Sequence, residues 1–153
     1  MTAESPTLTT STDLPWHLRD NWAPVLDEMT ETGLRVEGTI PPELNGTYVR
    51  TGPNPASGTS KHWFFGDGML HGIRLANGTA EWYRNRFVRT PNITDPLDDP
   101  SSGMGDLTRS TANTHVMAHN GELLCLEEAH LPWRADTELN TLGVQDYGGA
   151  LTT

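Results

Sequence analysis

The chain has 153 residues, enough for one domain of ordinary size, and 35% of them are hydrophobic. Its formal net charge is −10, from 10 Lys and Arg against 20 Asp and Glu, which argues against nucleic acids and anionic lipid surfaces as partners. No apolar stretch is long enough to cross a bilayer, and the N-terminus lacks the basic start and apolar core of a secretory signal. We therefore expect a cytoplasmic protein without a transmembrane segment.

The first residues predict a flexible tail. Residues 1–20 are rich in Thr, Ser, Asp and Pro and show no apolar period, so we expect the folded part to span residues 21–153. Two short strands are expected next, GLRVEG over 33–38 and GTYVRTG over 46–52, because glycines bound the first and β-branched and aromatic residues fill the second.

Two hairpins follow, each with an Asn-Gly pair at its turn. Residues 69–75 and 79–89 flank Asn77-Gly78, and residues 113–119 and 122–128 flank Asn120-Gly121. Asn-Gly favours the positive φ angles of a tight hairpin turn. A polar loop is expected over 91–105, and a further strand pair within 132–149. The sequence thus predicts an antiparallel all-β fold whose strand order suits a β-propeller, although the pattern is also compatible with a β-sandwich.

The histidines are candidate metal ligands. His115 and His119 lie four residues apart on an expected strand, which separates their bases by about 13 Å and prevents them from sharing one ion. His62 and His71 flank the bend at Gly66-Asp67-Gly68, where they would either bond backbone groups or be brought together as ligands.

Few other residues suggest chemistry. The single cysteine, Cys125, lies between two leucines with no basic neighbour, so we expect it to be buried and unreactive. Three aspartates, Asp95, Asp98 and Asp99, share one loop, but their spacing differs from that of a calcium-binding loop, which favours a solvated acidic loop.

Several stretches in order resemble the carotenoid cleavage oxygenase family, which includes the lignostilbene-cleaving enzymes. They are NWAPV, VEGTIPPELNGTYVRTGPNP, HWFFGDGMLHG, RNRFVRT and NTHVMAHNGELLCLEEAHLPW, between about Asn21 and Tyr147. Phe65 departs from the family pattern, which has Asp before Gly-Asp-Gly. The resemblance implies a seven-bladed β-propeller with iron(II) on its axis, held by four histidines, some of them hydrogen-bonded to glutamates.

The same resemblance implies an activity. It is the O₂-dependent cleavage of a C=C double bond in an apolar conjugated substrate, such as a carotenoid, an apocarotenoid or a stilbene-like compound, to two carbonyl products. Neutral imidazoles suit an iron that binds O₂, and a carboxylate behind an imidazole fixes its tautomer. Glu127 matches such a carboxylate, although it could instead be an exposed carboxylate at a strand end. None of the six histidines matches an iron ligand, so we expect the four ligands beyond Thr153.

Length limits what the chain does alone. At about 40–50 residues per blade, 153 residues supply only about three blades. We therefore expect an N-terminal fragment of the dioxygenase, with an incomplete propeller and no activity of its own. The alternative is a non-catalytic remnant or structural partner that needs a complementary chain, because open strand edges favour pairing with another chain or self-association.

Overall fold

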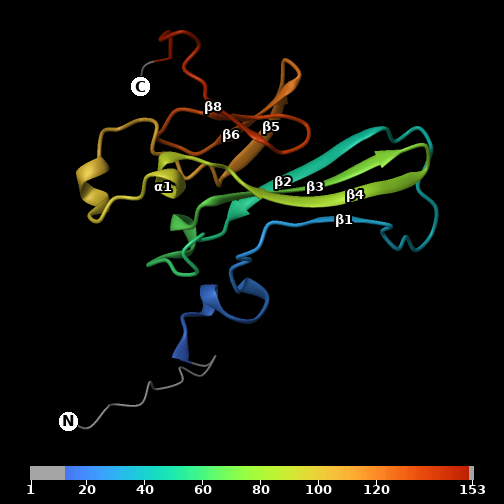
Figure 1. The fold of residues 1–153 in the computed structure, drawn as a ribbon, viewed down its shortest axis with the longest axis horizontal. Helices are drawn as coiled ribbons and strands as arrows, with labels where there is room; N and C mark the ends of the chain where they lie inside the picture. The colour runs from blue at the N-terminus through green and yellow to red at the C-terminus, as the bar shows by residue number, and fades with distance from the viewer. Residues whose placement is uncertain (1–12, 152–153) are drawn as a thin grey trace.

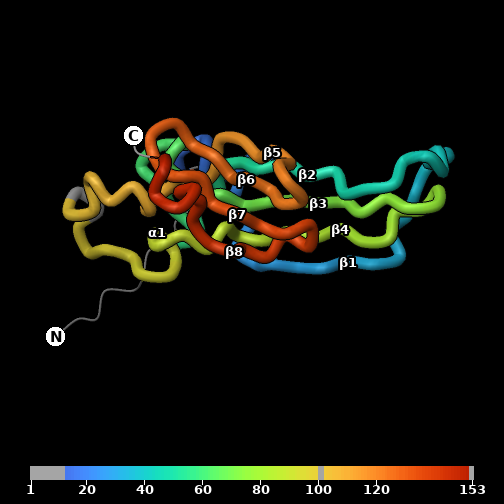
Figure 2. Tube along the Cα trace, turned by 90° about the horizontal axis from the view of Figure 1, so that it is seen from above, coloured from blue at the N-terminus to red at the C-terminus, as the bar shows by residue number. Residues whose placement is uncertain are grey.

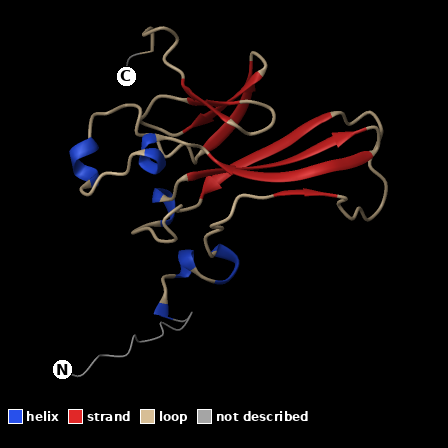
Figure 3. Ribbon diagram, viewed as in Figure 1, coloured by secondary structure: helices blue, strands red, loops and turns tan. Residues whose placement is uncertain are grey.

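Residues 13–151 are described by the computed structural model, and they form two four-stranded antiparallel sheets (Figures 1 and 3). The first sheet has the strand order β1-β4-β3-β2, and the second has the order β5-β6-β7-β8. The strands are β1 (Thr30–Thr32), β2 (Gly46–Pro53), β3 (Gly68–Ala76), β4 (Thr79–Phe87), β5 (His115–His119), β6 (Glu122–Leu126), β7 (Trp133–Ala135) and β8 (Thr141–Val144). The helical segments are the 3₁₀ turns η2 (Trp16–Leu18), η3 (Asp20–Trp22), η4 (Trp63–Phe65) and η5 (Pro100–Gly103) and the helix α1 (Pro91–Thr94). The expected antiparallel all-β fold is confirmed.

Both predicted hairpins are present, with their turns at the Asn-Gly pairs. Asn77 and Gly78 have φ angles of 50° and 76°, and Asn120 and Gly121 have φ angles of 49° and 82°. These left-handed conformations match the twist of the flanking strands. The pairs β3–β4 and β5–β6 therefore lie where the Asn-Gly turns predict them, and β7–β8 is the strand pair expected within 132–149.

Two local predictions were wrong. The strand expected over 33–38 is absent, and β1 lies just before it, because Gly33 and Gly38 have φ angles of 69° and 91° and the chain bends at both. The loop expected over 91–105 begins with the short helix α1, whose first residue, Pro91, has the φ angle that a helix start needs.

The flexible tail expected over residues 1–20 lies only partly within the described residues. Its first twelve residues lie outside the described part of the chain. In the rest of it, Leu18 is buried with 6% of its surface exposed, and the ring of Trp16 packs against that of Trp63 at 5.5 Å. These apolar contacts hold η2 and η3 against the folded part, which composition alone did not reveal.

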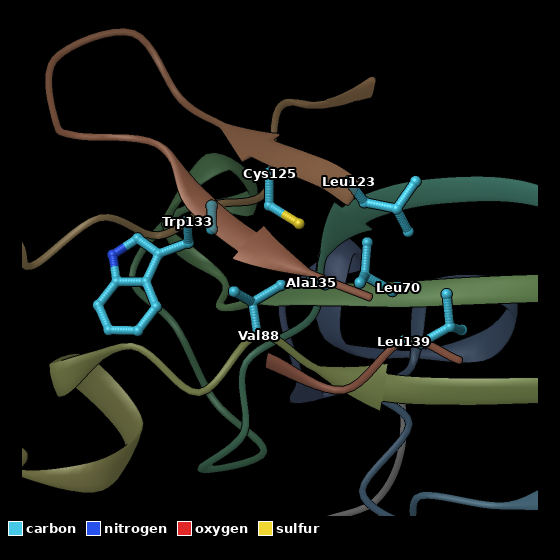
Figure 4. Close-up of a cluster of buried hydrophobic side chains, with 8 residues drawn as sticks. Leu70, Val88, Leu123, Cys125, Trp133, Ala135 and Leu139 are labelled. Carbon is cyan, nitrogen blue, oxygen red and sulfur yellow. The ribbon is translucent and has the colours of Figure 1, made fainter. Parts of the chain in front are cut away.

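The two sheets pack face to face over one end of the first sheet, while the tip of the β3–β4 hairpin projects beyond the second sheet (Figure 2). The core between them, drawn in Figure 4, consists of Leu70, Val88, Ala112, Leu123, Cys125, Trp133, Ala135 and Leu139. Cys125 is fully buried there, and burial raises the pKa of its thiol to about 12. The expected burial of Cys125 is thus confirmed.

A buried asparagine on β4 holds the extended segment that leads into β1. The amide oxygen of Asn85 accepts a hydrogen bond from Met29 N at 2.7 Å, and its amide nitrogen donates to Asp27 O at 2.9 Å. Asn85 is 0% exposed, so water cannot replace either bond.

We expect Asn85→Ala to lower the free energy of unfolding by roughly 2–4 kcal/mol, because it leaves two backbone groups unpaired and a small cavity. Asn45→Ala is the matched control, because Asn45 is exposed and accepts only a surface bond from Arg74. Urea unfolding of both variants measures the difference. Midpoints that are equal for the two variants would show that the Asn85 bonds contribute nothing net.

Candidate functional site

A cavity of about 470 Å³ lies where the first sheet meets the second, close to the ends of β2 and β6. We call it the Phe64–Glu128 cavity. One side is aromatic and comes from η4, and the other carries two carboxylates that follow β6. Its lining residues are Thr51, Gly52, Pro53, Trp63, Phe64, Phe65, Thr111, Asn113, Thr114, Glu127 and Glu128. An apolar wall that faces a few polar groups is the usual composition of a small-molecule site.

The Gly66-Asp67-Gly68 bend positions the aromatic side of this cavity. Asp67 O accepts a hydrogen bond from Asn54 N at 2.7 Å, and its side chain accepts one from Ala56 N at 2.9 Å. Gly68 N donates to Thr111 O at 2.7 Å. Burial raises the pKa of the Asp67 carboxyl group above its usual range. The bend therefore ties η4 to the loop after β2 and to the segment before β5.

Both glycines of the bend are required by close backbone contacts. A Cβ atom at Gly66 would lie 2.7 Å from Asn54 N, and one at Gly68 would overlap the carbonyl group of Ala112. Asn113 completes the link, because its amide nitrogen donates to Phe64 O at 2.8 Å and to Gly66 O at 2.6 Å. The backbone of Phe64 is thus held by the side chain of Asn113, which lies just before β5.

The two adjacent glutamates differ in their partners. Glu127 has only 12% of its side chain exposed, and its Oε1 accepts hydrogen bonds from Ala129 N, from His130 N at 2.6 Å and from His130 Nδ1 at 2.7 Å. Glu128 is exposed, and its Oε2 accepts one bond from Thr114 Oγ1 at 3.2 Å. Glu127 is therefore largely buried, and it pairs with His130, a histidine that the sequence did not single out.

The other candidate histidines do not form a cluster. His115 and His119 are exposed at the two ends of β5. His62 Nδ1 accepts a hydrogen bond from Phe64 N at 3.2 Å. Of the two roles expected for His62, a backbone bond or metal ligation, this is the backbone bond. His71 Nδ1 lies 2.8 Å from the Tyr83 hydroxyl on β4. Within residues 13–151, no group of three or more His, Cys, Asp or Glu side chains could hold a metal ion.

His71 titrates far below the usual range. Its burial, together with the charge of Arg50, lowers its pKa from 6.5 to about 4. Between these values the unfolded chain binds a proton that the folded chain does not, so stability falls as the pH drops through this window.

We expect His71→Gln to flatten the dependence of the unfolding free energy on pH between about 4 and 6.5. His115→Gln, at an exposed position, should leave the slope unchanged. Urea unfolding at several pH values measures both slopes. An unchanged slope in His71→Gln would mean that His71 does not cause it.

In the described part of the chain, no helix is long and apolar enough to cross a membrane.

Comparisons with known proteins match these features. The family model described as retinal pigment epithelial membrane protein matches residues 22–153. A carotenoid cleavage oxygenase of Mycobacterium tuberculosis is 42% identical over 137 residues, which cover 84% of this chain and 27% of that protein. The chain thus spans less than a third of the length of this relative.

Solved structures agree. The lignostilbene dioxygenase of Pseudomonas brassicacearum superposes with a TM-score of 0.66 at 31% identity, over 84% of this chain and 30% of that one. Cobalt-substituted Synechocystis ACO superposes with a TM-score of 0.69 at 28% identity, over 84% of this chain and 31% of that one. Other structures of the Synechocystis apocarotenoid oxygenase carry a glutamate changed to glutamine or aspartate, the tryptophan directly before it changed to alanine, or an earlier threonine changed to alanine.

These neighbours are β-propellers, so the prediction that the two sheets are propeller blades is confirmed. The resemblance inferred from the quoted stretches is confirmed as well. The chain belongs to the retinal pigment epithelial membrane protein family, the family of the carotenoid cleavage oxygenases.

Proposed function

We propose that this chain forms part of a dioxygenase that uses O₂ to cleave a C=C double bond in a carotenoid, an apocarotenoid or a stilbene-like substrate. The Phe64–Glu128 cavity is its contribution to the substrate site. The observation that carries the proposal is the pairing of an aromatic wall with carboxylates in one cavity of a chain from this family. We also propose the cytoplasm as its location.

The aromatic wall suits a flat apolar substrate. Phe64 and Phe65 expose 65% and 68% of their surfaces, although aromatic rings of this size are usually covered. A conjugated hydrocarbon would stack against these rings and displace water from them. Phe65 would extend this apolar wall at a position where the family pattern has a charged residue.

Iron(II) is the proposed cofactor of the complete enzyme. The described residues do not fit an iron ion by themselves, because no three ligating side chains come together. When held by neutral imidazoles elsewhere in the protein, iron supplies O₂ binding. The part left to this chain is to bind substrate and to orient a ligand histidine through a carboxylate.

Two carboxylates are candidates for that orienting role. Glu127 is the one that the sequence resemblance predicts, and it stays a candidate. Glu128 is favoured by its exposure in the cavity, since Glu127 already accepts three bonds within its own loop. In the Synechocystis variants, the altered threonine precedes the altered glutamate by the same 14 residues that separate Thr114 from Glu128. We therefore propose Glu128 as the orienting carboxylate and Glu127 as the residue that fixes the loop.

A product assay tests the proposed activity. The longest gene product that contains residues 1–153 is loaded with iron(II) and incubated with stilbenes and apocarotenoids under ¹⁸O₂. We expect two carbonyl products from one of these classes, with label from O₂ and with no product when O₂ is removed. Iron-loaded protein that leaves every conjugated alkene intact would overturn the proposal.

The second candidate function is a non-catalytic structural partner. It is supported by the outer strands of both sheets, β1 and β2 in the first and β5 and β8 in the second, which have no neighbour on one side among the described residues. Light scattering of the purified chain, with and without a complementary family segment, tests it. If the chain is a monomer and does not bind the segment, this function is rejected. Formation of a complex without cleavage activity would favour it.

A further inference from the structure

A second cavity, of about 380 Å³, opens on the side of the first sheet that faces away from the second sheet. Arg50 on β2 and His71 on β3 are paired across the strands, so both point to this side, whereas the next residue, Leu70, points into the core. The N-terminal turns η2 and η3 form the opposite wall. We call it the Arg50–Trp63 cavity, after two of its lining residues.

The charge of this cavity is opposite to that of the chain. The lining includes Arg50, His17 and His71 but no aspartate or glutamate, although the chain carries a net charge of −10. A cavity with cationic and neutral polar walls and no carboxylate favours an anion.

Arg50 differs from the other arginines of the chain. Among residues 13–151, the guanidinium group of Arg50 makes no hydrogen bond and no ion pair. The neighbouring His71 ring instead contacts the Tyr83 hydroxyl. Each of the other arginines has a partner: Arg19, Arg35, Arg74, Arg84, Arg86, Arg89, Arg109 and Arg134. No described residue therefore competes with a ligand for the five N–H donors of Arg50.

Beside this cation, the cavity offers a rigid apolar surface. The rings of Trp22 and Trp63 meet edge to face at 5.0 Å, and both line the cavity. His17 Nε2 lies 3.2 Å from Ser60 O, which holds η2 against the loop on the other side. Flat rings packed in this way accept a planar group at little cost in conformational entropy.

We propose that the Arg50–Trp63 cavity binds a carboxylate attached to a planar conjugated body. The guanidinium group takes the carboxylate in a two-pronged contact, and the tryptophan rings hold the planar part. Phe64, Glu127 and Glu128 do not line this cavity, and the recognised group is a charge rather than a double bond. The two cavities share Trp63 and the end of β2, at Thr51, Gly52 and Pro53, but carboxylate binding at Arg50 needs neither iron nor O₂.

Isothermal titration of the 153-residue chain with trans-cinnamate tests it, with cinnamyl alcohol as the uncharged analogue. We expect one cinnamate per chain and binding of the alcohol that is at least about tenfold weaker, since a charge-assisted hydrogen bond is worth about one factor of ten or more. Arg50→Gln should weaken cinnamate binding by about tenfold and leave the alcohol unaffected, and Arg50→Lys should keep part of the affinity.

Arg35→Gln is the matched control, because it removes the same charge from an exposed residue that lines none of the cavities described above. It should change cinnamate affinity by less than about twofold. The proposal is overturned if cinnamate does not bind, if the alcohol binds equally well, or if Arg35→Gln weakens binding as much as Arg50→Gln. It is also overturned if Arg50→Gln binds cinnamate as the unmodified chain does.

Discussion

Gly68→Ala is expected to lower the free energy of unfolding by roughly 2–4 kcal/mol, since overpacking against fixed backbone has no cheap relief. The added Cβ would overlap the carbonyl group of Ala112 and would lie 2.8 Å from Thr111 O. At the same place Gly68 N donates to Thr111 O at 2.7 Å. The first strand of the β3–β4 hairpin and the segment before β5 would therefore have to separate, which also moves η4 away from the cavity.

Gly52→Ala is the matched control for this prediction. Gly52 lies on β2 and lines the same cavity, and a Cβ atom added to it would have no atom within 4 Å. We expect its free energy of unfolding to change by less than about 0.5 kcal/mol. Urea unfolding curves of the two variants give the comparison. If the urea midpoint of Gly68→Ala equals that of Gly52→Ala, the close contact at Gly68 relaxes without a cost in stability.

Glu128→Gln is expected to lower kcat for alkene cleavage by about 10–100-fold in the complete enzyme, because a carboxylate that orients a ligand histidine typically has an effect of this size. The fold should remain stable, since Glu128 is exposed and accepts a single bond from Thr114. Glu127→Gln should mainly lower the stability of the fold and affect kcat less. It weakens three bonds within one loop, so we expect a loss of about 1–2 kcal/mol of stability and a smaller effect on kcat.

Steady-state kinetics and urea unfolding of the same two preparations separate these roles. If Glu127→Gln abolishes turnover at unchanged stability while Glu128→Gln remains active, Glu127 is the orienting carboxylate, as the resemblance first suggested. The unmodified protein and Glu122→Gln, at a β6 position outside the Phe64–Glu128 cavity, serve as references.

The hairpins could be predicted because their signals are local. Asn77-Gly78 and Asn120-Gly121 each set the turn and thereby the register of two strands. The single cysteine could also be assigned, since two flanking leucines on a strand indicate burial. These local signals were reliable, whereas the glycines that bound residues 33–38 marked bends and not the ends of a strand.

Long-range contacts could not be predicted in this way. Asn85 holds residues 27–29 across a sequence separation of more than 50 residues, and Asn113 reaches Phe64 over 49. Nothing in the local pattern marks these asparagines as buried. The partner of Glu127 was missed for a different reason: His130 is only three residues away, but it meets Glu127 because the chain turns after β6.

The central claim is that conjugated substrate binds in the Phe64–Glu128 cavity. Photolabelling with a stilbene that carries a diazirine, followed by tryptic mass spectrometry, tests it most directly. We predict label in the peptides 62–74 and 110–134, which contain the aromatic wall and both glutamates, and loss of that label when unmodified stilbene competes. Competed label confined to the peptide 90–109, away from this cavity, would contradict the claim.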